Sequence, residues 1–170
     1  MEIFGIPHQA FLGQLLLGLV NGAFYAMLSL GLAVIFGLLD VVNFAHGALY
    51  MLGAFVAWLL LDKLGINYWF ALVLAPLTVG ALGVVIERLF LKHLYKLDPL
   101  YGLLLTFGLA LIIEGIFREL FGSSGQEYPV PALLQGATNL GFMILPIYRT
   151  WVVVVSLAVC LGTWYLIERT

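Results

Sequence analysis

Long stretches without a charged side chain constrain the fold of this chain more than any other feature. No Asp, Glu, Lys or Arg occurs between residues 3 and 39. Similar stretches cover residues 41–61, 64–86, 99–113, 128–148 and 150–167. A helix needs about 20 apolar residues to cross the roughly 30 Å hydrocarbon layer of a bilayer. Because 64% of the residues are hydrophobic and 9% are charged, too few polar side chains remain to cover a soluble domain. We therefore predict an all-α polytopic membrane protein.

The charge-free stretches predict about five membrane segments in a single transmembrane domain over residues 1–170. The first segment, residues 10–39, is interrupted by glycines and is too long for one upright helix, so we expect it to be tilted, broken or partly re-entrant. The other four segments are expected at residues 44–61, 68–86, 100–120 and 151–167. The acidic opening "MEIFGIPHQA" is not typical of a cleavable signal peptide, so we expect the first segment to be retained.

Basic residues near the segment ends predict the orientation, because cytoplasmic loops are enriched in Lys and Arg. Arg88, Lys92 and Lys96 lie together after the third segment. Their position places the 87–98 loop in the cytoplasm and the 122–148 loop in the periplasm. Glycine, proline and asparagine within 122–148 are typical of turns, so we expect a folded loop there, for which a hairpin is one form.

Several function classes find no support in the sequence. A net charge of −2 without a basic stripe argues against nucleic-acid binding. Cys160 is the single cysteine, which excludes an internal disulfide or a CxxC motif, and we expect no metal site. Asp40 and Glu114 are isolated acids and no nucleophile stands in a GxSxG-like setting, so an intramembrane enzyme is not indicated. No P-loop GxxxxGK[ST] occurs, and we expect no cofactor bound by this chain.

A stripe of small and polar residues runs along the first segment. Its members recur at intervals of three to four residues, which places them on one helical face: Gln14, Gly18, Asn21, Gly22, Tyr25 and Ser29. Such a face either packs against another helix or lines an aqueous path. Asn21, Tyr25 and Ser29 are therefore candidate pathway residues, with a helix contact as the alternative.

The fourth segment carries a second set of candidates. Thr106, Ala110, Glu114 and Arg118 follow one another at intervals of four, and Glu114 and Arg118 are spaced to form an ion pair. A lone carboxylate in a membrane is costly, so a structural pair near the outer interface is the simpler interpretation. The alternative is that Thr106, Glu114 and Arg118 take part in the translocation path.

A polar cluster interrupts the apolar sequence at "DVVNFAHGALYMLG", residues 40–53. Asp40 and Asn43 are residue types that favour helix N-caps, and the residues after them predict a helix with His46 in its first turn. Such a helix start presents free backbone N–H groups, a device that transporters use to meet anionic substrate groups. We expect Asn43, His46 and Tyr50 to share one face and Gly47 to permit close backbone approach. A short interfacial loop with a solvated histidine is the alternative.

A resemblance to a known family favours the functional interpretation. The stretch "NGAFYAMLSLGLAVIFGLLDVVNFAHGALYMLGAFVAW", residues 21–58, resembles the N-terminal signature of permease subunits of bacterial ABC importers for branched-chain amino acids, which contains an N-F-A-H-G motif. "TFGLALIIEGIFRELFG", residues 106–122, is similar to a second stretch of that family. The final "WYLIERT" is similar to the segment that leads into the loop docking on the ATPase. Family members continue past that loop, so the resemblance implies the N-terminal part of a longer permease.

The resemblance implies a multi-pass protein of the bacterial inner membrane that is not itself an enzyme. Its implied partners are a second, homologous permease subunit, two ATP-binding cassette ATPase subunits that use the ATP, and a periplasmic binding protein that delivers branched-chain or other hydrophobic amino acids. Related permeases for urea and short amides leave a second substrate class open. A truncated membrane scaffold that carries nothing is the alternative from another class.

Overall fold

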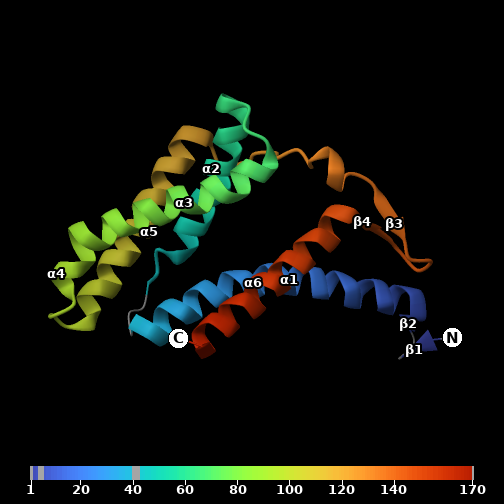
Figure 1. Cartoon of the computed structure of the whole chain (residues 1–170), viewed down its shortest axis with the longest axis horizontal. Helices are drawn as coiled ribbons and strands as arrows, with labels where there is room; N and C mark the ends of the chain where they lie inside the picture. The colour runs from blue at the N-terminus through green and yellow to red at the C-terminus, as the bar shows by residue number, and fades with distance from the viewer. Residues whose placement is uncertain (1, 4–5, 40–42, 170) are drawn as a thin grey trace. The chain divides into compact units, whose positions relative to one another are not determined.

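The computed structural model describes residues 2–3, 6–39 and 43–169. Within them, five helices are long and apolar enough to cross a membrane (Figure 1). They are α1 (His8–Leu39), α2 (His46–Leu64), α3 (Tyr68–Ile86), α5 (Pro99–Phe121) and α6 (Ile147–Arg169). The prediction of an all-α polytopic membrane protein is therefore confirmed. The largest boundary difference is at the start of α6, predicted at residue 151, because the exposed Arg149 lies inside the first helical turn rather than before it.

Helix α1 is one continuous helix of 32 residues despite its internal glycines. At 1.5 Å per residue it is about 48 Å long, well beyond the hydrocarbon thickness. A helix of this length fits a bilayer by tilting or by extending out of it. Of the three forms expected for the first segment, the broken one is not found within residues 8–39.

Local sequence signals fix several helix ends. Helix α2 ends at Gly65, whose left-handed φ of 63° lets its N–H donate to the Leu61 carbonyl at 3.0 Å. Asn67 caps α3 by accepting the Phe70 N–H at 3.3 Å. Asp98 caps α5 by accepting the Leu100 N–H at 2.9 Å, with Pro99 at the first helical position, where a missing N–H has no consequence.

Shorter elements lie between the long helices. A π-helix, η1 (Glu87–Leu91), continues α3 and leads into the short α4 (Lys92–Leu94). Strands β1 (Glu2–Ile3) and β2 (Ile6–Pro7) pair near the N-terminus, and η2 (Ala132–Leu134) is a 3₁₀ turn. Strands β3 (Ala137–Asn139) and β4 (Ile144–Pro146) form an antiparallel hairpin, as the turn residues of the 122–148 loop suggested.

Contacts divide the chain into two compact units. Unit 1 comprises residues 1–30 and 130–170, and unit 2 comprises residues 31–129. The expectation that the chain acts as a single transmembrane domain stays a prediction.

Unit 2 is organised around α2, which contacts both α3 and α5. Small side chains form these contacts: Ala71 and Ala75 of α3 are buried, as are Ala48 of α2 and Ala110 of α5. Small residues let helix backbones approach closely. In lipid there is no hydrophobic driving force between helices, so this close van der Waals packing is what holds them together. Unit 2 is therefore a close-packed helical group whose outward faces remain apolar.

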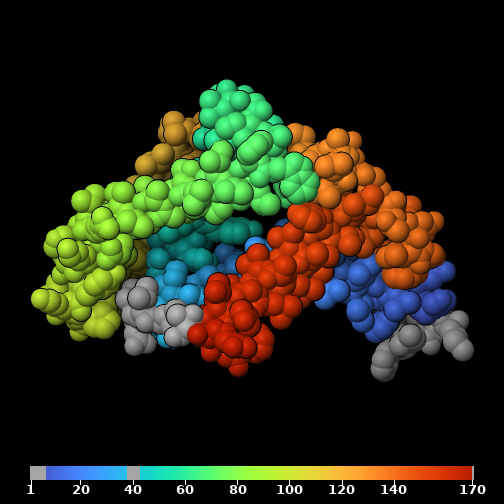
Figure 2. Space-filling model, in the orientation of Figure 1, coloured from blue at the N-terminus to red at the C-terminus, as the bar shows by residue number. Residues whose placement is uncertain are grey.

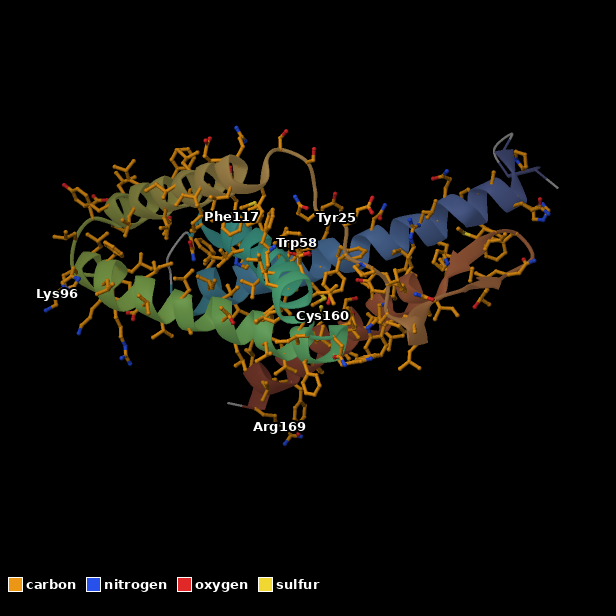
Figure 3. The ribbon with its side chains drawn as sticks, turned by 90° about the horizontal axis from the view of Figure 1, so that it is seen from above. Tyr25, Trp58, Lys96, Phe117, Cys160 and Arg169 are labelled. Atoms are coloured by element: carbon orange, nitrogen blue, oxygen red, sulfur yellow. The ribbon has the colours of Figure 1, made fainter. Side chains whose placement is uncertain are left out.

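An aromatic cluster joins α2 and α5 toward the end of α5. The rings of Phe55 and Phe117 lie 4.7 Å apart, and those of Phe55 and Phe121 lie 5.0 Å apart. Trp58 meets Phe121 edge-on at 5.7 Å. Figure 3 labels Trp58 and Phe117 in this part of unit 2. Tilted and edge-on pairs at such distances are favourable arrangements of aromatic rings, so they hold the two helices together at this level.

Unit 1 contains the first part of α1, the hairpin and α6. Leu134 and Leu145 are its buried loop residues, and the hairpin's Met143 sulfur lies 3.9 Å from where a Cβ on Gly13 would be. Ser156, inside α6, is buried, and its hydroxyl donates a hydrogen bond to the Val153 carbonyl at 2.9 Å. The loop therefore contacts α1 near Gly13 and, through η2 and β4, α6, consistent with a folded rather than an extended connection.

Candidate functional site

The turn before α2 is organised by Asn43. Its side-chain Oδ1 accepts the Ala45 N–H at 3.0 Å, and its carbonyl accepts the His46 N–H at 3.3 Å. The helix itself begins at His46, with Ala45 in the cap position and no side-chain cap there. Asn43 therefore caps a turn that precedes the helix, two residues earlier than a conventional N-cap. Asp40, the other predicted cap, lies outside the described residues.

Thr106 of α5 completes the same turn. Its Oγ1 accepts the Phe44 N–H at 3.2 Å and donates to the Leu103 carbonyl at 3.1 Å. Thr106 is 1% exposed. In an apolar surrounding a backbone N–H without an acceptor is costly, so this hydroxyl both satisfies the turn and ties it to α5. The two sets of candidate residues, those of the turn and those of the fourth segment, meet at this hydrogen bond.

This geometry occupies three of the N–H groups at the turn, and the expectation that the start of α2 offers free N–H groups to a substrate stays a prediction for the next residues, Gly47 and Ala48. The N–H groups of Phe44, Ala45 and His46 all find acceptors inside the chain. Backbone donors that are already paired give little to a ligand unless the pair breaks. Side chains of this turn, rather than these three backbone groups, are what the site presents.

His46 packs on Gly31 of α1, a residue that the polar stripe did not include. A Cβ placed on Gly31 would lie 2.7 Å from His46 Cε1 and 3.1 Å from Nε2. Glycine is therefore what allows the imidazole to lie against this part of the helix. Nothing in the sequence distinguished Gly31 from the other glycines of α1, because the contact joins two elements.

The other residues predicted around the turn are placed differently. Tyr50 is exposed on α2, and a Cβ on Gly47 would meet nothing within 4 Å among the described residues. No described residue approaches Gly47 closely, and the close approach that it permits stays a prediction. Asn21, Tyr25 and Ser29 are exposed and belong to unit 1, whereas the turn belongs to unit 2. The buried face of α1 instead contains Val20 and Ala23.

The face of α5 that packs inward differs from the one that the spacing predicted. Thr106, Ala110 and Ile113 are buried, whereas Glu114 and Arg118 are exposed. Each step of four residues advances 400°, a drift of 40° per step. The buried stripe therefore shifts to a three-residue step at Ile113. In the part of the chain that the structure describes, Glu114 and Arg118 form no ion pair, so the predicted structural pair is not present.

Five membrane-spanning helices, with a polar turn held between α2 and α5 and packed on α1, define a multi-pass α-helical membrane protein. The family described as branched-chain amino acid transport system / permease component matches residues 14–170. The chain belongs to this family.

Individual relatives agree with the family match. The high-affinity branched-chain amino acid transport system permease protein BraD of Pseudomonas aeruginosa is 25% identical over 173 residues, which cover 94% of this chain and 56% of BraD. LivH of Escherichia coli K12 is 29% identical over 140 residues, covering 77% of this chain and 44% of LivH. LivH of Salmonella typhimurium is 27% identical over 139 residues with the same coverage. The chain spans about half the length of the curated relatives it matches, and no solved structure matches it significantly.

Proposed function

We propose that this chain is a permease subunit of an ABC importer that carries branched-chain or other hydrophobic amino acids, delivered by a periplasmic binding protein. The observation that carries this proposal is the family match over residues 14–170, which includes all but the first turns of α1 and every other membrane helix. The printed names of BraD and LivH support the substrate class. The chain contributes part of the path through the membrane.

The turn from Asn43 to Gly47 is the part of the chain that we place nearest to the passing substrate. Three observations support this: the turn is polar in an apolar chain, His46 lies on a glycine of α1, and a buried threonine fixes the backbone before His46. A polar residue at membrane depth that faces other helices is a functional candidate by default. His46 and Tyr50 are the side chains that we expect to face the path.

In this proposal, partner subunits supply the energy for transport and select the substrate. The sequence of this chain contains no P-loop, so two separate ATPase subunits would bind and hydrolyse ATP. A second permease subunit would complete the path. The proposed location is the bacterial inner membrane, with the 87–98 loop in the cytoplasm and the 122–148 loop in the periplasm, on the basis of Arg88, Lys92 and Lys96.

Uptake measurements in the native cell test the proposal. Deleting the gene should reduce uptake of labelled leucine, isoleucine and valine while leaving urea and acetamide uptake unchanged. A His46→Gln replacement at the chromosomal locus should reduce leucine uptake per inserted molecule, whereas the exposed loop variant Ser124→Ala should not. Loss of urea or amide uptake alone would assign the other substrate class. Unchanged uptake of all these compounds after deletion would favour a membrane scaffold.

A further inference from the structure

We propose that the connection between α3 and α5 forms a binding site for anionic phospholipid headgroups. The site consists of Arg88, Lys92 and Lys96, called here the basic cluster. Arg88 lies in the π-helix η1, Lys92 begins α4, and Lys96 follows in the turn before α5. This inference does not depend on transport, and it names a ligand that the proposed function does not require.

The three cations of the basic cluster are exposed and form no ion pair with a described residue. Among the residues that the structure describes, the ion pair within 4.0 Å joins Lys63 to Asp62, and none involves the basic cluster. Unpaired cations grouped at the end of a membrane helix create a local positive potential. This potential is available for a negatively charged ligand.

Nearby acids are engaged elsewhere. The Tyr95 hydroxyl donates to Glu87 Oε1 at 3.3 Å, and Asp98 accepts the Leu100 N–H as the cap of α5. Burial raises the pKa of the Tyr95 phenol above its ordinary value, and the charge of Glu87 and the hydrogen bond to it raise it further. The phenol therefore stays protonated and remains a donor at physiological pH. Neither carboxylate pairs with the cluster.

Apolar side chains interleaved with the cations indicate a lipid rather than a soluble anion. Leu89, Phe90 and Leu97 are exposed, and Leu89 is 61% exposed. Helical structure continues from α3 through η1 and α4 to Leu94, so the cations lie directly at the end of a membrane helix. Figure 2 shows the surface around residues 90–98 at an end of unit 2, and Figure 3 shows Lys96 extending outward there. Cations alternating with apolar groups match the boundary between headgroups and acyl chains. Free phosphate has no apolar part that could contact these side chains.

Lipid binding by the purified full chain tests the proposal. The chain in neutral detergent micelles is titrated with short-chain phosphatidylglycerol or phosphatidylcholine, and the change in tryptophan fluorescence is followed. The test variant is R88Q/K92Q/K96Q. The matched control, K63Q/R149Q/R169Q, removes the same charge from other exposed positions. Each Lys or Arg near an anionic lipid surface strengthens binding by about 1 kcal/mol, which is about a fivefold change in the dissociation constant. The test variant should therefore bind phosphatidylglycerol about 100-fold more weakly at low salt, and the control should change by less than about threefold.

The outcomes separate the sources of binding. Equal loss in the test and control variants would overturn the proposal, as would equal affinity for phosphatidylcholine and phosphatidylglycerol. Glycerol phosphate that displaces the lipid at similar concentrations would show a soluble-anion site instead. Unchanged lipid binding combined with lost capture of the ATPase partner would show a protein-docking surface. If the triple variant does not fold, the exposed Lys96→Gln variant should still lose about fivefold, and no loss would overturn the inference.

Discussion

Replacing Gly31 by alanine should destabilise the protein through His46, although alanine is the better helix former. The new Cβ would lie 2.7 Å from His46 Cε1, whereas ordinary contact begins at 3.4 Å, so the imidazole must move by about 0.7 Å. Overpacking of this kind lowers the unfolding free energy by about 1–3 kcal/mol. The higher helix propensity of alanine raises it by about 0.8–1 kcal/mol. The net expectation for Gly31→Ala is a loss of about 0–2 kcal/mol.

A control on the same helix isolates the contact. A Cβ on Gly22 would meet no described residue within 4 Å, so Gly22→Ala should show the propensity gain alone. The two variants should therefore differ by about 1–3 kcal/mol in unfolding free energy, measured by unfolding the purified chain in mixed detergent micelles. In a His46→Ala background the difference should largely disappear, because the clashing ring is gone. If Gly31→Ala and Gly22→Ala behave alike within about 0.5 kcal/mol, His46 does not lie against Gly31.

Three further predictions concern the turn and the loops. Thr106→Val removes the acceptor of the Phe44 N–H and should cost about 1–3 kcal/mol in the same unfolding assay, whereas Thr106→Ser should stay near wild type; equal losses would contradict a role for the hydroxyl. Asn43→Ala should cost about 0.5–2 kcal/mol by removing the side-chain acceptor of the turn, and unchanged stability would show that the turn does not need it. In intact cells of a cysteine-free variant, an impermeant maleimide should label a cysteine at Gln126 and spare one at Lys92, and the reverse pattern would invert the proposed orientation.

The membrane helices could be predicted because their signals are local. Charge-free length determines where a helix can cross a bilayer, and caps such as Asn67, Asp98 and Gly65 act on their own neighbours in the sequence. The hairpin of the 122–148 loop also follows from local glycine and proline. Charge was a poorer guide at the start of α6, because a long arginine side chain can reach water from within a helix.

The candidate site depends on contacts that sequence spacing does not reveal. The hydrogen bond from Phe44 to Thr106 joins residues 62 positions apart, and the Gly31 contact joins two different helices. Spacing identified Thr106 as a face residue but extended that face to Glu114 and Arg118, because a four-residue repeat drifts around an α-helix. Which residues meet across helices is set by packing, and one sequence carries no direct record of it.

The π-helix η1 also has a consequence for insertions and deletions in this connection. Each residue of an α-helix turns the chain by about 100°, and a π-turn accommodates an extra residue within a continuous helix. Removing one residue from Glu87–Leu91 would let the segment become an α-helix and leave the membrane-spanning part of α3 unaltered. Because the wider π-turn already absorbs the added residue, the helix that follows would keep its orientation about the axis. A deletion of one residue at this point would therefore leave Lys92 and the entry into α5 facing as they do, whereas the same deletion within α3 would rotate them by about 100°.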